Sequence, residues 1–233
     1  MLFWFSKAWY NEAMKKNLSK IILGTLILLI VGFIFYALTR PETATTSSNN
    51  NRPKVQADVA KLSQGNAIGP VDAKVVVAEF GDYQCPACGK YHQVLKSGIL
   101  PAYDGKIRFV FLNYPLPIHK NAQSAAQAAE ASALQGKFWQ MHDLLYERQQ
   151  DWSEQKDPYA KFESYAKELG LDIAKFKSDY ASQQVADIIN NQAALGDAFN
   201  VPGTPTFFVN GVQVDNNQGS NALNQAIDKA LAQ

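Results

Sequence analysis

The feature that most constrains this chain is the pair Cys85 and Cys88, its only two cysteines. A disulfide between them closes a very short ring, so it would add only ~2 kcal/mol to stability, against about 4.7 kcal/mol for a 100-residue loop. A purely structural disulfide is therefore the weaker interpretation. Two thiols at this spacing favour redox chemistry.

The sequence around this pair predicts a strand that leads into a helix. Residues 74–80, KVVVAEF, form a continuous apolar run that is typical of a central strand covered on both faces. Apolar residues then follow Cys88 at helical spacing, at Tyr91, Val94 and Leu95. We therefore expect Cys85 at the N-terminus of a helix and Cys88 buried one turn further in.

This position predicts different roles for the two thiols. Unpaired N–H groups and the positive end of the helix dipole stabilise a thiolate, which makes Cys85 the nucleophile and Cys88 the resolving thiol. Pro86 suits the first helical position, because its missing N–H would have no intrahelical partner there. Pro86 and Ala87 together form the dipeptide that separates the two cysteines.

Two acidic residues precede the cysteines. Glu79 ends the apolar strand, where its side chain can point beneath the helix, and burial there would raise its pKa and suit it to exchange a proton with Cys88. The alternative is an exposed glutamate at the end of a strand. Asp82 is expected in the turn before the helix, where its charge would oppose the thiolate.

A metal site is the second alternative for the cysteines, since His92 follows them at a ligand-like spacing. Such a site would still need a fourth ligand from His119, His142, a carboxylate or water. We therefore predict no metal site, and we interpret His92 as a histidine at the helix surface or boundary.

Further strands are predicted at 107–112, 206–209 and 212–214, and the last two are joined by Asn210-Gly211, a strong hairpin signal. A helical block at about 119–199 separates the first of these from the others. It contains a face of small residues at helical spacing, formed by Ala122, Ala125, Ala126, Ala129 and Ala133. An amphipathic helix with Ser220 as its N-cap is expected to end the chain.

Residues 21–38 contain no charge, and as a helix they would span about 27 Å, close to the ~30 Å thickness of a bilayer core. Their length favours a retained anchor over a cleaved signal peptide. Lysines are more frequent before this segment than after it, which places residues 1–20 in the cytoplasm. Residues 39–60 are predicted to be a flexible linker, and 61–233 the folded domain outside the membrane.

The overall charge excludes one class of partner. The chain has 22 basic and 21 acidic side chains, a balance that does not suit a polybasic nucleic-acid binder. Its 47% apolar content also excludes a disordered polyelectrolyte.

Cys85-Pro86-Ala87-Cys88 after KVVVAEFGDYQ, with VPGTPTFFVNG more than a hundred residues later, resembles the DsbA-like thiol–disulfide oxidoreductases of the thioredoxin superfamily, in their membrane-anchored or secreted bacterial branch. The resemblance covers most of residues 70–233. It implies an α/β thioredoxin-like fold, in which a central mixed sheet is flanked by helices and carries an inserted helical domain.

The resemblance also implies roles for single residues. Pro205 would be cis and lie beside the cysteines, and Thr204 would meet the substrate backbone. The family's acidic residue before the motif maps onto Glu79. Ala87 departs from the strongest oxidants of the family, which have a histidine at this position, so a less depressed pKa is expected for Cys85.

These expectations lead to one function and two alternatives. The chain would use the Cys85–Cys88 disulfide, with no other cofactor, to oxidise cysteines of exported proteins, and a quinone-linked membrane partner would reoxidise it. The first alternative is a membrane-tethered reductase or isomerase that runs the same chemistry backwards. The second is a non-enzymatic chaperone or metal carrier.

Overall fold

The computed structural model describes residues 23, 28–30, 33, 36, 56–215 and 219–233. The chain divides into two compact units, Met1–Arg52 and Pro53–Gln233. In the first unit the described residues are helical and exposed. Among all described residues, no helix has both the length and the apolar character needed to cross a membrane. Most of the predicted span at 21–38, and all of 1–20 and 39–55, lie outside the described residues.

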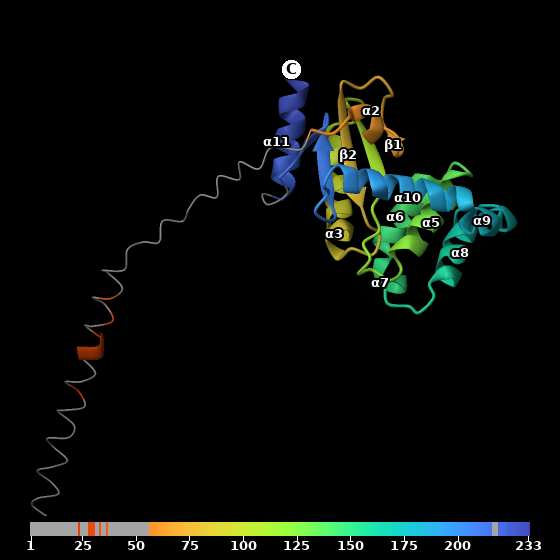
Figure 1. Ribbon diagram of the computed structural model, residues 1–233, viewed down its shortest axis with the longest axis horizontal. Helices are drawn as coiled ribbons and strands as arrows, with labels where there is room; N and C mark the ends of the chain where they lie inside the picture. The colour runs from red at the N-terminus through yellow and green to blue at the C-terminus, as the bar shows by residue number, and fades with distance from the viewer. Residues whose placement is uncertain (1–22, 24–27, 31–32, 34–35, 37–55, 216–218) are drawn as a thin grey trace, which may run out of the picture. The chain divides into compact units, whose positions relative to one another are not determined.

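The second unit is built on a five-stranded mixed sheet with the order β1-β3-β2-β4-β5 (Figure 1). The two central strands, β2 and β3, are parallel to each other, and the remaining neighbours are antiparallel. The strands are β1 (Asn66–Ile68), β2 (Val75–Gly81), β3 (Ile107–Asn113), β4 (Thr206–Val209) and β5 (Val212–Gln213).

Alternating side chains of β2 enter the cores on the two faces of the sheet. Val75 and Val77 pack on one face with helix α11, whereas Ala78 and Phe80 pack on the other. All four of these side chains are buried, and that of Val76 is half-buried. The apolar run therefore forms a central strand covered on both faces, as its sequence predicts.

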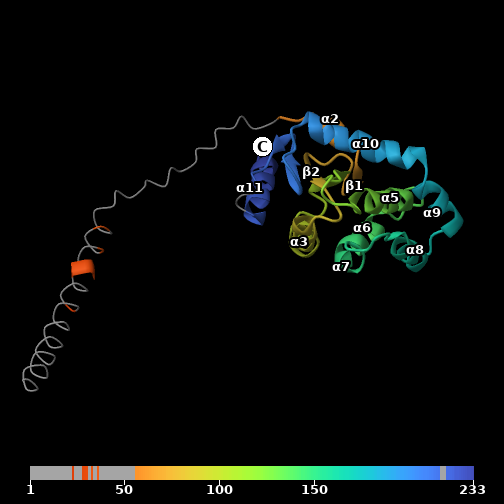
Figure 2. The same cartoon turned by 60° about the horizontal axis from the view of Figure 1, so that its bottom comes forward.

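Helices cover both faces (Figure 2). One face packs against the helix that contains Cys88, against the helical turns that continue it and against the C-terminal helix. The other face packs against two further helices. The helices on the first face are α3 (Pro86–Val94), the π-helix η1 (Leu95–Ile99), α4 (Leu100–Ala102) and α11 (Ser220–Leu231). Those on the second face are α2 (Val59–Leu62) and α10 (Gln183–Ala198).

A helical block joins β3 to β4, as predicted. Besides α10 it contains α5 (Ala122–Ala133), α6 (Phe138–Glu147), α7 (Gln149–Trp152), α8 (Tyr159–Glu168) and α9 (Ile173–Tyr180). The small-residue face of α5 is buried at Ala125 and Ala129, which are both 0% exposed. These alanines belong to a core that extends to the cysteines and to Trp152. Small side chains let the neighbouring helices approach α5 closely.

The β4–β5 hairpin turns at Asn210 and Gly211, which have φ of 46° and 82°. This confirms the Asn-Gly hairpin signal, because such a two-residue turn requires φ above zero at both positions. Residues before the predicted domain boundary also contact this turn. The Ala57 N–H donates to the Gly211 carbonyl at 2.7 Å, and Gln56 forms a bridge with Val212.

Three local features differ from the sequence-based expectations. Strand β1 was not predicted, since it is short and forms only through its antiparallel pairing with β3. Ser220 is the first residue of α11 and not its N-cap, which is Gly219 with φ of 63°. Val94 is exposed, because the chain passes into η1 directly after it and the regular helical spacing ends.

The buried face of α5 gives a first prediction. Ala129→Leu adds volume at a fully buried position of the core, so we expect the free energy of unfolding to fall by about 1–3 kcal/mol. Ala194→Leu, at an exposed position of α10, is the control and should change it by less than about 0.5 kcal/mol. Urea unfolding followed by tryptophan fluorescence measures both. Equal midpoints for the two variants would contradict close packing at Ala129.

Candidate active site

The two cysteines lie where the carboxyl end of β2 leads into α3. Cys85 is the N-cap of α3, with extended backbone angles, and Pro86 is the first helical residue. Both cysteines are free thiols and both are buried, Cys85 with 6% of its surface exposed and Cys88 with none. Pro86 and Ala87 are exposed between them. The helix therefore presents Cys85 at its N-terminal end and holds Cys88 inside the fold.

The surroundings of Cys85 stabilise its thiolate. Its pKa falls from 9.0 to about 5, chiefly through a hydrogen bond with the Cys88 side chain. The Thr204 side chain and the backbone N–H groups of Cys88 and Ala87 lower it further, while burial acts in the opposite direction. These backbone groups belong to the first turn of α3, where N–H groups have no intrahelical acceptor. The helix N-terminus therefore acts on Cys85 as the sequence predicts.

Cys88 has the opposite character. Burial raises its pKa well above 9.0, and the hydrogen bond with Cys85 and the charge of Glu79 act in the same direction. At neutral pH Cys88 is therefore a thiol, whereas Cys85 is a thiolate. The two sulfurs differ in chemistry although they lie one helical turn apart.

Glu79 lies on β2 between Phe111 of β3 and Phe207 of β4, and only 1% of its surface is exposed. The exposed strand-end alternative is therefore wrong. Burial, together with the charge of Cys85, raises the pKa of Glu79 from 4.5 to about 8. Its Oε1 atom is buried without a hydrogen-bond partner among the described residues. At neutral pH this carboxyl group holds a proton close to the two thiols.

The segment Thr204-Pro205 reaches the cysteines because β4 pairs with β2. The Cys85 Sγ lies 3.4 Å from the Thr204 carbonyl oxygen, across 119 positions of sequence. The Thr204–Pro205 peptide bond is cis, as the resemblance implied. The structure thus brings together all the predicted site residues: Glu79, Cys85, Pro86, Ala87, Cys88, Thr204 and Pro205.

Two side chains, those of Asp82 and Gln149, stabilise the turn before α3 through contacts that the sequence does not predict. Asp82, fully buried in this turn, accepts hydrogen bonds from the backbone N–H of Gln84 at 2.7 Å and of Leu116 at 2.9 Å. Its second oxygen also lies 2.7 Å from His119 Nδ1. Gln149 Nε2 donates to the Tyr83 carbonyl at 2.7 Å and to the Cys85 carbonyl at 3.0 Å. No local sequence signal marks partners so distant in the chain.

The sequence predicts His92 at the surface or boundary of the helix, but the structure buries it. It is 5% exposed, because α6 packs against this side of α3 and stacks Tyr146 on the imidazole at 5.1 Å between ring centroids. Among the described residues, the group with metal-ligand geometry joins His92 to His142 and Asp143, and neither cysteine is part of it.

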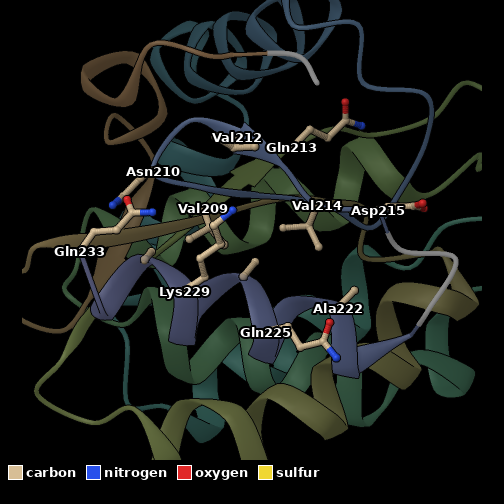
Figure 3. A pocket seen from close by; sticks show the side chains of 12 residues that line it. Val209, Asn210, Val212, Gln213, Val214, Asp215, Ala222, Gln225, Lys229 and Gln233 are labelled. Carbon is tan, nitrogen blue, oxygen red and sulfur yellow. The ribbon is translucent and has the colours of Figure 1, made fainter. Parts of the chain in front are cut away.

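A separate pocket of about 440 Å³ lies between the β4–β5 hairpin and α11. Figure 3 shows its side chains, among them Val214 from the hairpin end and Gln225 and Lys229 from α11. None of the predicted site residues lines it. The redox site consists of the α3 N-terminus, Glu79 on β2 and the segment Thr204-Pro205 directly before β4.

A family model described as thioredoxin matches residues 61–229. The chain belongs to this thioredoxin family. The crystal structure of the thiol–disulfide exchange protein alpha-DsbA2 from Wolbachia pipientis has the same fold, with a TM-score of 0.59 and 21% identity, covering 73% of this chain and 94% of that one. The crystal structure of oxidised BdbD from Bacillus subtilis superposes with a TM-score of 0.65 and 26% identity, covering 77% of this chain and 98% of that one. The thioredoxin-like α/β fold expected from the sequence is thereby confirmed.

The similar region covers nearly all of some related proteins and only a small part of others. The probable disulfide bond formation protein D of Bacillus cereus is 28% identical over 217 residues, which are 91% of this chain and 94% of the relative. The Na⁺/H⁺ antiporter NhaA 3 of Salinispora tropica is 38% identical over 165 residues, which are 70% of this chain. The chain spans only 24% of that antiporter's length.

The pKa of Cys85 gives a second prediction. Because the folded protein lowers this pKa to about 5, the thiolate persists down to that pH and is lost below it. The rate of alkylation of the reduced chain by iodoacetamide should therefore rise with a midpoint near pH 5. Cys85→Ser leaves only Cys88 and should react slowly at every pH below 9. A midpoint at about 8.5, the value of an ordinary thiol, would contradict the account of the helix N-terminus.

Proposed function

We propose that this chain is a protein-disulfide oxidoreductase that donates its Cys85–Cys88 disulfide to exported proteins. The observation that carries the proposal is the opposite shift of the two thiol pKa values, down at Cys85 and up at Cys88. A dithiol in which one sulfur is a stabilised thiolate favours the reduced state, and a protein with such a pair is an oxidant. The same observation disfavours the reductase alternative.

The reaction begins at Cys85, the cysteine nearer the surface. A substrate thiolate attacks the Cys85 sulfur of the disulfide, and the Cys85–Cys88 bond breaks as the mixed disulfide forms. The electron pair of the broken bond goes to Cys88, which leaves as a thiolate. Thr204 and Pro205 lie beside this position, where they would meet the substrate backbone.

Glu79 supplies the proton that this step requires. Its pKa of about 8 keeps the carboxyl group protonated at neutral pH, whereas the pKa of the buried Cys88 is higher still. Proton transfer from Glu79 to Cys88 is therefore favourable and removes a thiolate from a site that does not stabilise it. The carboxylate that remains must later regain a proton.

The second step releases the product. A second substrate thiolate attacks the substrate sulfur of the mixed disulfide, and Cys85 leaves as the thiolate that the α3 N-terminus stabilises. The substrate gains a disulfide and loses two electrons, which the reduced Cys85–Cys88 pair retains. A sulfur with a pKa of about 5 is a good leaving group, which is the physical reason for the oxidising direction.

The remaining parts of the proposal concern location and recycling. The uncharged segment 21–38 would anchor the chain in the cytoplasmic membrane, with the N-terminus inside and the catalytic domain outside. A quinone-linked membrane partner would reoxidise Cys85 and Cys88. The similarity to a disulfide bond formation protein along 91% of this chain supports this setting.

Disulfide transfer tests the proposal directly. The oxidised full chain, mixed with an equimolar amount of reduced, unfolded ribonuclease A, should lose its disulfide as the ribonuclease gains one. The Cys85→Ser variant should transfer none, and an unrelated buried substitution such as Ala129→Leu should keep the activity at temperatures where it is folded. An oxidised chain that leaves the ribonuclease thiols unchanged would refute the oxidising function and favour a chaperone or carrier.

The role of Glu79 gives a further prediction. Glu79→Gln keeps the shape but holds no exchangeable carboxyl proton, so we expect mixed-disulfide formation to slow on the order of 10²-fold. Burial keeps the pKa of Glu79 raised in the oxidised chain as well, so the wild-type rate should fall at alkaline pH, where Glu79 loses its proton, and this fall should vanish in the variant. Stopped-flow measurements with a low-pKa thiol keep the ionisation of the attacking group constant.

Glu154→Gln is the matched control, since Glu154 is exposed and its ion pair among the described residues is with Lys120 at 3.8 Å. Its rate and pH profile should equal those of the wild type. If Glu79→Gln also has the wild-type profile between pH 6 and 9, Glu79 does not transfer the proton.

A further inference from the structure

A second group of reactive side chains lies where the C-terminal part of α3 packs against α6, beside a cavity of about 420 Å³. The cavity is lined by residues from α3, η1, α4, β3 and α6, and its polar lining includes His92, His142 and Asp143. The proposed disulfide exchange uses none of these three side chains. Their ligand atoms all lie within 4.8 Å of one another.

The histidines have the form that binds metals. Both side chains are buried, with 5% of His92 and 3% of His142 exposed, and burial disfavours the charged imidazolium. Metal ions bind the neutral imidazole. Among the described residues, His92 Nε2 is buried without a hydrogen-bond partner, and it lies 3.5 Å from Asp143 Oδ1. A buried ring nitrogen in this state is available to a ligand.

His142 is held by a contact of the kind that orients metal-binding histidines. Its Nδ1 lies 3.0 Å from the Tyr83 hydroxyl group, which leaves Nε2 as the nitrogen that can bind an ion. A histidine that binds a metal through one nitrogen usually donates the N–H of the other to an oxygen atom. The Tyr83 oxygen can accept such a bond.

Asp143 offers one oxygen to an ion while the other is occupied. Its Oδ2 accepts a hydrogen bond from Lys96 Nζ at 2.6 Å, and the same ammonium group bonds Glu147 Oε1 at 2.6 Å. With both histidines neutral, Lys96 and the carboxylates of Asp143, Glu147 and Asp104 leave two net negative charges around the cavity. This charge favours entry of a cation despite the nearby ammonium group.

We propose that His92, His142 and Asp143 form a binding site for a divalent first-row transition ion, with Zn²⁺ as the best fit. Ligand bonds of about 2.0–2.2 Å place two tetrahedral ligands about 3.4 Å apart, close to the His92–Asp143 separation of 3.5 Å. Two nitrogen ligands and one carboxylate oxygen suit Zn²⁺ better than Ca²⁺ or Mg²⁺. The fourth position faces the cavity and can hold water.

This site departs from the sequence-based expectation of no metal, and it is separate from the redox pair. His92 follows Cys88 by one turn of α3, yet the ligand group contains neither sulfur. The two sites share a helix but no ligand. A bound ion would join α3 to α6, the helix of the helical block that packs against α3.

Cobalt binding to the full chain tests the proposal. The double variant Cys85→Ser/Cys88→Ser removes the thiols as competing ligands, and Co²⁺ is the probe because its visible absorption reports the coordination geometry. We expect one Co²⁺ per chain with the strong absorption of a tetrahedral site, and displacement of Co²⁺ by Zn²⁺. Zn²⁺ should also raise the melting temperature, because it binds the folded chain preferentially.

Substitutions in the double variant identify the ligands. His92→Gln and Asp143→Asn should each weaken Co²⁺ binding at least about 10-fold. Asp104→Asn, which changes an exposed carboxylate lining the same cavity, and His119→Gln should leave the affinity unchanged. Asp143→Asn carries the test if His92→Gln does not fold, since Asp143 is 35% exposed and its substitution preserves shape.

Three results would overturn the proposal. The first is a double variant that binds no Co²⁺. The second is weak binding with an octahedral spectrum, which would indicate carboxylates at the surface. The third is equal affinity in Asp143→Asn and Asp104→Asn, which would show that the ion does not bind at the predicted ligands.

Discussion

The chemistry of this protein depends on the unequal surroundings of two sulfurs one helical turn apart. Cys85 caps α3, where hydrogen-bond donors lower its pKa to about 5, whereas Cys88 is buried and its pKa is raised. The sheet makes this contrast possible: β2 directs the chain into α3 and places Glu79 beneath it, and β4 brings Thr204 to Cys85. β2, the N-terminus of α3 and the segment that leads into β4 thus contribute groups to the same site.

Local sequence patterns predict the parts of this site that follow one another in the chain. The apolar run of β2, the helix that begins at Pro86 and the Asn210-Gly211 hairpin all form as expected, because strand composition, a proline at the helix start and turn geometry act over a few residues. The cis geometry of Pro205 came from the family resemblance, since local sequence makes it a minority outcome.

Contacts between distant segments could not be predicted in this way. The burial of His92 depends on the packing of α6 against α3, and the short strand β1 forms only beside β3. The pair formed by Asp82 and His119 joins the turn before α3 to a loop 37 positions later. These contacts arise from tertiary packing, and the packing of α6 against α3 also creates the side-chain group proposed to bind a metal ion.

The most direct test of the central claim is the equilibrium of the Cys85–Cys88 pair with glutathione, measured on the full chain. A thiolate stabilised at the α3 N-terminus favours the reduced pair, so the account predicts a reduction potential nearer about −120 mV, the value of DsbA. A potential near about −270 mV, the value of thioredoxin, would mean that the disulfide is the preferred state. That result would contradict the oxidising function and the role of the helix N-terminus on which it rests.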